Sequence, residues 1–164
     1  MSIELASLEV IEDFLTQKCI AIVGMSRDPK SMSAFLFQEF FRRGYDVVPV
    51  NPNVQEVLGQ KCFARVQDIA PPVDAALLMT APQVTELVVS HCAAAGIRRV
   101  WMHRGGGQGA VSEHAVEVCR QRGINVIPGE CPLMFLARTG GIHSFHGFLR
   151  KLFRRYPKRA AAKG

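Results

Sequence analysis

The residues best suited to chemistry in this 164-residue chain follow a short apolar run that ends at Gly24. Ser26 offers a hydroxyl there, and Arg27 and Lys30 offer cations, just before a stretch with helical spacing. A strand that runs into glycine and then a helix start presents backbone N–H groups and a positive helix end to an anion. A nearby ammonium strengthens the attraction for phosphate. The segment predicts a site for a phosphorylated ligand, the alternative being an ordinary turn with solvated charges.

The same segment excludes two common nucleotide-binding motifs. A dinucleotide fingerprint needs the pattern GxGxxG, and Ser26 stands where the second glycine would be. The acid that holds the adenosine ribose of NAD after the second strand is also missing, because Val50-Asn51-Pro52 stands there. No GxxxxGK[ST] loop is present. A phosphorylated ligand other than NAD is therefore expected.

The elements that must position this loop alternate between strand-like and helix-like periodicity. Strands are expected near 19–23, 46–50, 62–63, 74–79, 99–102 and 124–127, and helices near 5–15, 32–43, 82–95, 112–122 and 131–137. This order predicts an α/β fold, a Rossmann-like three-layer sandwich with a mostly parallel sheet. Such sheets bind ligands at the carboxyl ends of their strands. The loops of interest begin at Gly24, Asn51, Thr80, His103 and Pro128.

Composition and length predict one Rossmann-like domain over residues 1–139, followed by an amphipathic helix and a basic tail over 140–164. With 48% hydrophobic and 21% charged residues, the chain can bury a core. No apolar run reaches the ~20 residues of a membrane span, and the acidic start does not resemble a secretory signal. Five cysteines without a CxxC pair favour a reducing cytoplasm.

The net charge of +6 is concentrated at the C-terminus, since residues 150–164 hold seven bases and no acid. Such a tail can bind nucleic acid or an anionic membrane, or merely aid solubility. Without a zinc-finger or helix-turn-helix signal, nucleic acid and membrane are not the favoured partners. An apolar stripe precedes the tail, and it packs on the domain, on a second subunit or at a membrane surface. Its members are Phe145, Phe148, Leu149, Leu152 and Phe153.

Four segments in a fixed order carry a family resemblance. They are IAIVGMSRDPKS, GYDVVPVNPNVQEVLGQKCF, VDAALLMTAP and GIRRVWMHRG, with Cys131 after them, and they cover about residues 12–135. Together they resemble the small stand-alone CoA-binding proteins. That family shares its fold with the CoA-binding domain of succinyl-CoA synthetase alpha chains and acyl-CoA synthetases.

The resemblance implies coenzyme A as the ligand and three groups of contact residues. The groups are the phosphate contacts Gly24, Met25, Ser26 and Lys30, the wall after the second strand formed by Val50, Asn51 and Pro52, and the nucleotide-flanking residues Thr80, Ala81 and Pro82.

The chain departs from the family pattern in two places. The family commonly carries Gln and a shorter loop after the Trp-Met pair, whereas this chain has His103, Arg104 and three glycines. The family also usually stops soon after the cysteine, whereas this chain continues from Gly140 to Gly164. His103 is interpreted either as a base or phosphate contact or as a polar rim residue. The glycine-rich loop 104–109 either wraps an anion or simply connects two elements.

Two further candidates concern a thiol and a metal. Cys131 follows a strand and is expected at a helix start, which lowers a thiol pKa. The hypothesis is a mixed disulfide between Cys131 and the CoA thiol, and the alternative is a buried packing cysteine.

His143 and His146 lie one helical turn apart, yet tetrahedral zinc needs three or four ligands. No metal is therefore expected.

No nucleophile, base and orienting acid occur together in one motif, so catalytic residues are not assigned. We expect a non-catalytic CoA or acyl-CoA binding protein with a carrier or regulatory role rather than an enzyme. One alternative is a subunit of an acyl-CoA synthetase or ligase acting with a partner. Another is a nucleic-acid-associated regulator that uses the tail. A homodimer and a synthetase partner both remain open.

Overall fold

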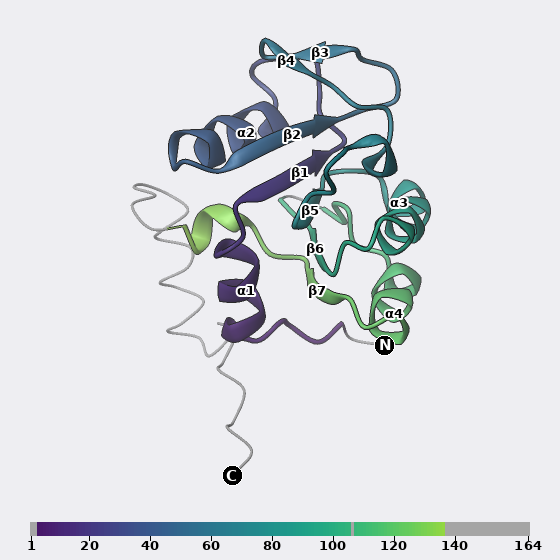
Figure 1. The fold of residues 1–164 in the computed structure, drawn as a ribbon. Coiled ribbons are helices and arrows are strands. Elements are labelled where there is room, and N and C mark those ends of the chain that lie inside the picture. The colour runs from purple at the N-terminus through teal and green to yellow at the C-terminus, as the bar shows by residue number, and fades with distance from the viewer. Residues whose placement is uncertain (1–2, 106, 137–164) are drawn as a thin grey trace.

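The computed structural model describes residues 3–105 and 107–136 and has a parallel five-stranded sheet at its centre (Figure 1). The strand order is β2-β1-β5-β6-β7. The strands are β1 (Cys19–Val23), β2 (Asp46–Val50), β5 (Ala75–Leu78), β6 (Arg99–Met102) and β7 (Asn125–Pro128). Every neighbouring pair in this sheet is parallel. The predicted α/β fold with a parallel sheet is confirmed.

Within the described residues, four α-helices connect and flank the strands, and the two remaining strands form a hairpin. The helices are α1 (Leu8–Leu15), α2 (Met32–Arg42), α3 (Pro82–Ala94) and α4 (Glu113–Gln121), with 3₁₀ turns η1 (Val66–Asp68) and η2 (Pro132–Met134). The hairpin joins β3 (Glu56–Val57) to β4 (Gln60–Lys61). The helix expected beyond residue 139 lies outside the described residues, and no described helix is long and apolar enough to cross a bilayer.

The sheet divides the core into two layers. Ile20 and Ile22 of β1 pack with α1, α2 and η2 on one face, whereas Ala21 and Val23 pack with α3 and α4 on the other. β1 and β5 lie in the middle of the sheet, so they need apolar side chains on both faces, and β5 is wholly buried. The connection after β1 passes through α2 on one face, and the connection after β5 passes through α3 on the other face. The strand order therefore reverses between β1 and β5.

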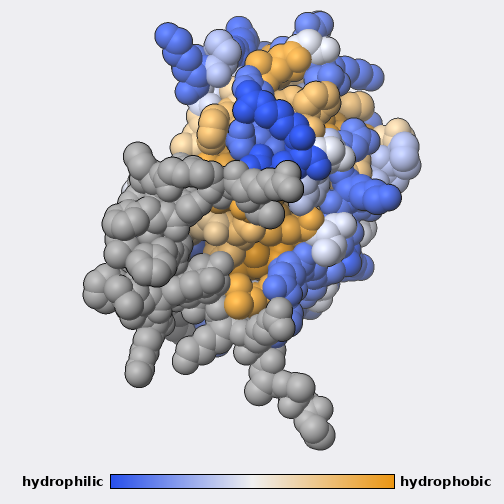
Figure 2. All heavy atoms as spheres, turned by 90° about the vertical axis from the view of Figure 1, so that its left-hand side faces the viewer, coloured by the Kyte–Doolittle hydropathy of each residue, from blue (hydrophilic) through white to orange (hydrophobic). Residues whose placement is uncertain are grey.

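The face with α1 and α2 holds the aromatic part of the core. Trp101 of β6 meets Phe14 of α1 edge-on, with ring centroids 5.2 Å apart, and its indole N–H donates to the Glu130 carbonyl at 2.8 Å. On this side of the molecule apolar residues reach the surface beside hydrophilic ones (Figure 2). The large apolar side chains that α2 exposes are Met32, Phe35 and Phe41.

Three helices begin with a serine cap that the sequence places one residue before the apolar spacing starts. Ser7 accepts from the Val10 N–H, Ser31 from the Ala34 N–H, and Ser112 from the Ala115 N–H. α3 instead starts at Pro82, whose missing N–H is not needed in the first turn.

Two sequence expectations differ from the structure. The strand expected at 62–63 is a single bridge from Phe63 to Val50, and the hairpin just before it was not anticipated. Its turn residues Leu58 and Gly59 both have positive φ, which suits a tight two-residue turn. The helix expected over 131–137 is only the single 3₁₀ turn η2 in its described part.

Candidate nucleotide-binding edge of the sheet

The candidate site lies at the carboxyl edge of the sheet, where β1 and β5 send their loops toward opposite faces. Ligands of open α/β sheets bind at this reversal point. Gly24 and the segment 79–82 meet there, with the loop after β2 beside them. The structure therefore brings the three predicted groups of contact residues to one edge.

Gly24 ends β1 where the two central loops touch. Its φ is +91°, and a Cβ built there would lie 2.6 Å from the Met79 carbonyl oxygen and 3.2 Å from Cγ2 of Thr80. Any side chain would therefore be strained and would also collide with backbone. The glycine is required by the contact between the loops after β1 and β5.

The backbone donors of the first loop are already used inside the protein. The N–H groups of Gly24 and Met25 both donate to the Val50 carbonyl, at 2.9 and 3.3 Å. The Ser26 N–H donates to Oγ of Ser33 at 3.0 Å. The Met25 side chain is fully buried in the aromatic layer. These N–H groups shape the loop, and an incoming anion meets other donors.

The donors that remain at this loop come from hydroxyls and from the start of α2. Ser26 Oγ accepts from the Asp28 N–H at 3.1 Å, so its own O–H is left to donate outward. Ser31 caps the helix through the Ala34 N–H. The N–H groups of Met32 and Ser33, in the first turn, have no acceptor within the helix. Unbound N–H groups beside a positive helix end are chemically suited to an anion.

Lys30 adds a full positive charge next to this helix start. Its backbone N–H is fixed by the Asp28 carboxylate at 2.9 Å, and its residue is exposed. No ion pair of its ammonium occurs among the described residues. Arg27 is committed differently, because its guanidinium donates to the Asn53 carbonyl at 2.8 Å. Of the two cations, Lys30 is the one whose charged group has no hydrogen bond or ion pair among the described residues, whereas Arg27 keeps only part of its guanidinium for a ligand.

Asn51 ties the loop after β2 to the first loop. Its Nδ2 donates to the Met25 carbonyl at 2.6 Å, and its Oδ1 accepts from the Asn53 N–H at 2.8 Å. Its amide is thereby used as a brace, a role that the sequence did not reveal. Val50 is buried at the end of β2, and Pro52 is exposed beside the loop.

Thr80, in the loop after β5, has a hydroxyl oxygen that can accept a hydrogen bond. Thr85, which is fully buried on α3, donates its hydroxyl proton to the Ala81 carbonyl at 3.2 Å. The 2.7 Å contact between the two threonine hydroxyls then requires Thr80 to be the donor. Thr80 Oγ1 is left with lone pairs, which suit a ribose hydroxyl or an amine better than a phosphate. Ala81 and Pro82, at the start of α3, complete this wall.

The loop after β6 is built differently from the first loop. His103 is only 7% exposed, so the interpretation as a polar rim residue is wrong. Its carbonyl accepts from the Ala110 N–H at 2.8 Å, which closes the loop at its base. Gly109 is pressed into this closure, because an added Cβ would lie 2.5 Å from the His103 oxygen. Arg104 Nε donates to the Gly107 carbonyl at 2.8 Å.

The thiol after β7 is not activated. Burial raises the pKa of Cys131, the nearby Glu130 carboxyl adds to this effect, and a bond from the Leu133 backbone opposes it. The turn η2 that follows is three residues long and provides no α-helical N-terminus. The expectation that a helix start lowers the Cys131 pKa is therefore wrong.

The described residues contain no group of three or more His, Cys, Asp and Glu side chains that could hold a metal. His143 and His146 lie outside the described residues.

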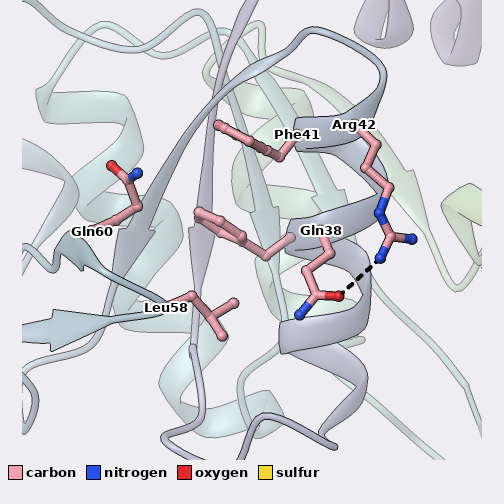
Figure 3. Close-up of a pocket in the computed structure, with 6 residues that line it drawn as sticks. Gln38, Phe41, Arg42, Leu58 and Gln60 are labelled. Atoms are coloured by element: carbon pink, nitrogen blue, oxygen red, sulfur yellow. Dashed lines mark hydrogen bonds between the residues drawn. The ribbon is translucent and has the colours of Figure 1, made fainter.

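A cavity of about 300 Å³ lies elsewhere, between α2 and the β3–β4 hairpin (Figure 3). Its lining is Phe37, Gln38, Phe41, Arg42, Leu58 and Gln60. Gln38 accepts there from the Arg42 guanidinium at 3.3 Å. None of the predicted contact residues lines this cavity, so it is separate from the candidate site.

The strand order defines an open parallel α/β domain whose candidate site lies at the point where the order reverses. Residues 18–137 match the family model described as a CoA binding domain, and the chain belongs to this family.

The chain is similar to both small and large proteins. It is 28% identical over 123 residues to the uncharacterized protein YneT of Bacillus subtilis, covering 75% of this chain and 88% of that protein. It is 27% identical over 143 residues to an ADP-forming acetate–CoA ligase of Archaeoglobus fulgidus, covering 82% of this chain but only 21% of the ligase. A solved hypothetical protein from Pyrococcus horikoshii matches with a TM-score of 0.70 and 26% identity, over 80% of this chain and 94% of that one.

Proposed function

We propose that the chain binds CoA or an acyl-CoA at the carboxyl ends of β2, β1 and β5. In this role it acts as a carrier or regulator and catalyses no reaction itself. The binding domain spans residues 1–139, with 140–164 as an accessory segment. All five cysteines are free thiols, which fits a role in the reducing cytoplasm.

The observation that carries the proposal is the pairing of an anion-binding helix start with an acceptor wall. Lys30, the Ser26 hydroxyl and the first turn of α2 receive the phosphates. The Thr80 hydroxyl, whose oxygen keeps lone pairs, accepts from the sugar or the base. Membership of a CoA binding domain family supports CoA among the phosphorylated nucleotides.

The same geometry argues against NAD. An NAD site needs a carboxylate after the second strand to accept the ribose hydroxyls. Asn51 stands at that point, and its neutral amide already donates to the Met25 carbonyl and accepts from the Asn53 N–H. No carboxylate therefore stands at this position to accept both ribose hydroxyls.

The test is isothermal titration of the reduced protein with CoA, acetyl-CoA and NAD. We expect CoA to bind, NAD to give no heat of binding, and Lys30→Ala to weaken CoA about tenfold or more, as expected for a charge-assisted contact. Lys18→Ala is the matched control, because Lys18 is also exposed but precedes β1 at the opposite edge. A folded protein that ignores CoA, or equal effects of the two substitutions, would contradict the proposal.

A second candidate is a CoA-binding subunit that works with a synthetase partner. It is favoured by the match to the Archaeoglobus fulgidus ligase, of which this chain spans about a fifth. In that case the partner supplies the catalytic groups. Acyl-CoA formation by the chain with a co-purified partner, and none by the chain alone, would establish this role over that of a carrier.

A further inference from the structure

A second cation, Arg104, is fixed at the far end of the same edge. Its Nε bond to the Gly107 carbonyl holds the side chain back over its own loop. The guanidinium thereby crosses to the end of β7, since Nη1 and Cδ would lie 3.9 and 3.5 Å from a Cβ built on Gly129. The two ends Nη1 and Nη2 have no carboxylate partner among the described residues.

The carboxyl group nearest in sequence to Gly129 lies in a different environment from this cation. Glu130 is fully buried, whereas Arg104 is exposed. Because Nε is already bound, the Nη1–Nη2 pair is the part of the fork left to grip a carboxylate through two N–H groups. An exposed but immobilised guanidinium loses little side-chain entropy when it binds such a group.

The position of Arg104 matches the reactive end of the proposed ligand. The strands β5, β6 and β7 follow β1 in order, and neighbouring strands are about 4.8 Å apart. Arg104 and Gly129 therefore lie about 10–15 Å along the edge from Gly24. With the phosphates at α2 and the nucleotide between the loops after β2 and β5, the pantetheine arm is long enough to bring its thioester there.

We propose that Arg104 binds the free carboxylate of an acyl group, so that the preferred ligands are CoA thioesters of dicarboxylic acids. This inference rests on the proposed CoA binding. Lys30 and the start of α2 bind the phosphates at the β1 end of the edge. Arg104, at the β6 end, is therefore left for a second anionic group of the ligand. A carboxylate at the end of a short acyl chain is such a group.

The experiment compares glutaryl-CoA with valeryl-CoA, which have five-carbon acyl chains that end in a carboxylate and a methyl group. Affinities are measured by titration calorimetry for the wild type, Arg104→Gln, Arg104→Lys and Arg98→Gln. Arg98 is a matched control, because it is exposed, donates to the Arg122 carbonyl and lies at the opposite end of β6. Circular dichroism confirms that each variant is folded.

We expect the wild type and Arg98→Gln to bind glutaryl-CoA about tenfold tighter than valeryl-CoA. In Arg104→Gln the ratio should fall to about one, with an intermediate value for Arg104→Lys, which keeps the charge but not the fork. A wild-type ratio near one, or a ratio that survives in Arg104→Gln, overturns the inference while CoA binding stands.

Free CoA and dephospho-CoA separate this role from a contact with the 3′-phosphate of CoA. If Arg104→Gln weakens CoA but not dephospho-CoA, Arg104 binds that phosphate and the acyl-carboxylate role is overturned. If the folded wild type binds neither CoA nor either thioester, the failure belongs to the proposed function itself.

Discussion

The two ends of the carboxyl edge share a tightly packed glycine but use their side chains differently. In the loop after β1, backbone bonds to the Val50 carbonyl are supplemented by side chains: Ser33 and Asn51 hold the loop backbone, and Arg27 ties it to the next loop. In the loop after β6, a backbone bond from the Ala110 N–H to the His103 carbonyl closes the loop, and Arg104 contributes one bond to its own loop through Nε. The first loop therefore keeps a helix start and a few side-chain groups for a ligand, whereas the second keeps the Nη1 and Nη2 groups of Arg104.

In the proposed function this difference would separate general from selective recognition. The β1 end would bind the phosphates of the ligand through a hydroxyl, an ammonium and a helix start. The β6 end carries a guanidinium, whose two N–H groups match a planar carboxylate. On the two proposals together, one end would bind the cofactor and the other would distinguish the acyl group that it carries.

The largest expected effect is the loss of stability when Gly24 or Gly109, the tightly packed glycine of each loop, is replaced by alanine. Gly24→Ala should lower the free energy of unfolding by about 2–4 kcal/mol, because strain from positive φ adds to a collision with the Met79 carbonyl. Gly109→Ala should have a similar effect through the His103 carbonyl. The control Gly44→Ala has positive φ but open space, so about 1 kcal/mol is expected. Urea denaturation gives the three values.

Ligand binding by the same variants sharpens the comparison. Gly24→Ala should lose affinity for every CoA compound, whereas Gly109→Ala should lose the preference for glutaryl-CoA over valeryl-CoA. Calorimetry at a temperature where both variants are folded measures this. Equal stability of Gly24→Ala and Gly44→Ala would show that the two central loops are not in close contact.

The next effect concerns the brace at Asn51. Asn51→Ala removes the donor to the Met25 carbonyl and the acceptor for the Asn53 N–H, so unfolding should become easier by about 1–3 kcal/mol. CoA affinity should fall with it, since the first loop loses its support. Asn125→Ala, at the exposed amino end of β7, should change stability by less than about 0.5 kcal/mol. Unchanged CoA affinity in folded Asn51→Ala would show that the brace is not needed for binding.

A smaller effect distinguishes two serine caps. Ser31→Ala removes an N-cap and should reduce stability by about 1 kcal/mol in thermal or urea unfolding. Ser112→Ala removes an N-cap and also the 2.6 Å hydrogen bond that the Ser112 hydroxyl donates to the Glu86 carboxylate, so it should reduce stability by about 2–3 kcal/mol. Only Ser31 caps the helix assigned to the phosphates, so only Ser31→Ala should weaken CoA, by a few-fold. If Ser112→Ala weakens CoA equally, the anion position is not at the start of α2.

The sequence was sufficient to predict the fold because its signals are local. Each buried strand is a short apolar run, and serine or proline marks the start of each helix, so the alternation and the parallel sheet follow. The β3–β4 hairpin was missed because its strands are two residues long and mostly polar, with no apolar alternation to reveal them.

The site was predictable only in outline. The strand ends indicated which loops meet, but the sequence does not show which donors are already bound to another part of the chain. The Met25 N–H and the Asn51 amide are used by contacts between loops about 26 residues apart, which no local pattern encodes. His103 follows a strand like a rim residue, yet the closure of its loop buries it. Long-range packing decides such details.

The smallest expected effect concerns Cys131, at the end of the edge where a thioester would lie. Because burial raises its pKa, the thiol stays protonated at pH 7.5 and alkylation by iodoacetamide should be slower than for a free peptide thiol. The rate should rise as the pH exceeds 9 and the thiolate forms. Site-resolved mass spectrometry after timed labelling measures this. Protein unfolded in urea, where every thiol reacts as a model thiol, is the control.

Cys19 provides an internal comparison at the opposite edge. Burial and the carboxylates of Asp46 and Asp74 raise its pKa to about 11, so its labelling should also be slow at pH 7.5. Mild oxidation with CoA should then give no mixed disulfide at Cys131, and Cys131→Ser should leave CoA affinity unchanged. A CoA adduct at Cys131, or labelling as fast as in the unfolded chain, would show that the thiol is exposed and activated when the ligand arm is present. The two ends of the edge would then differ in reactivity as well as in recognition.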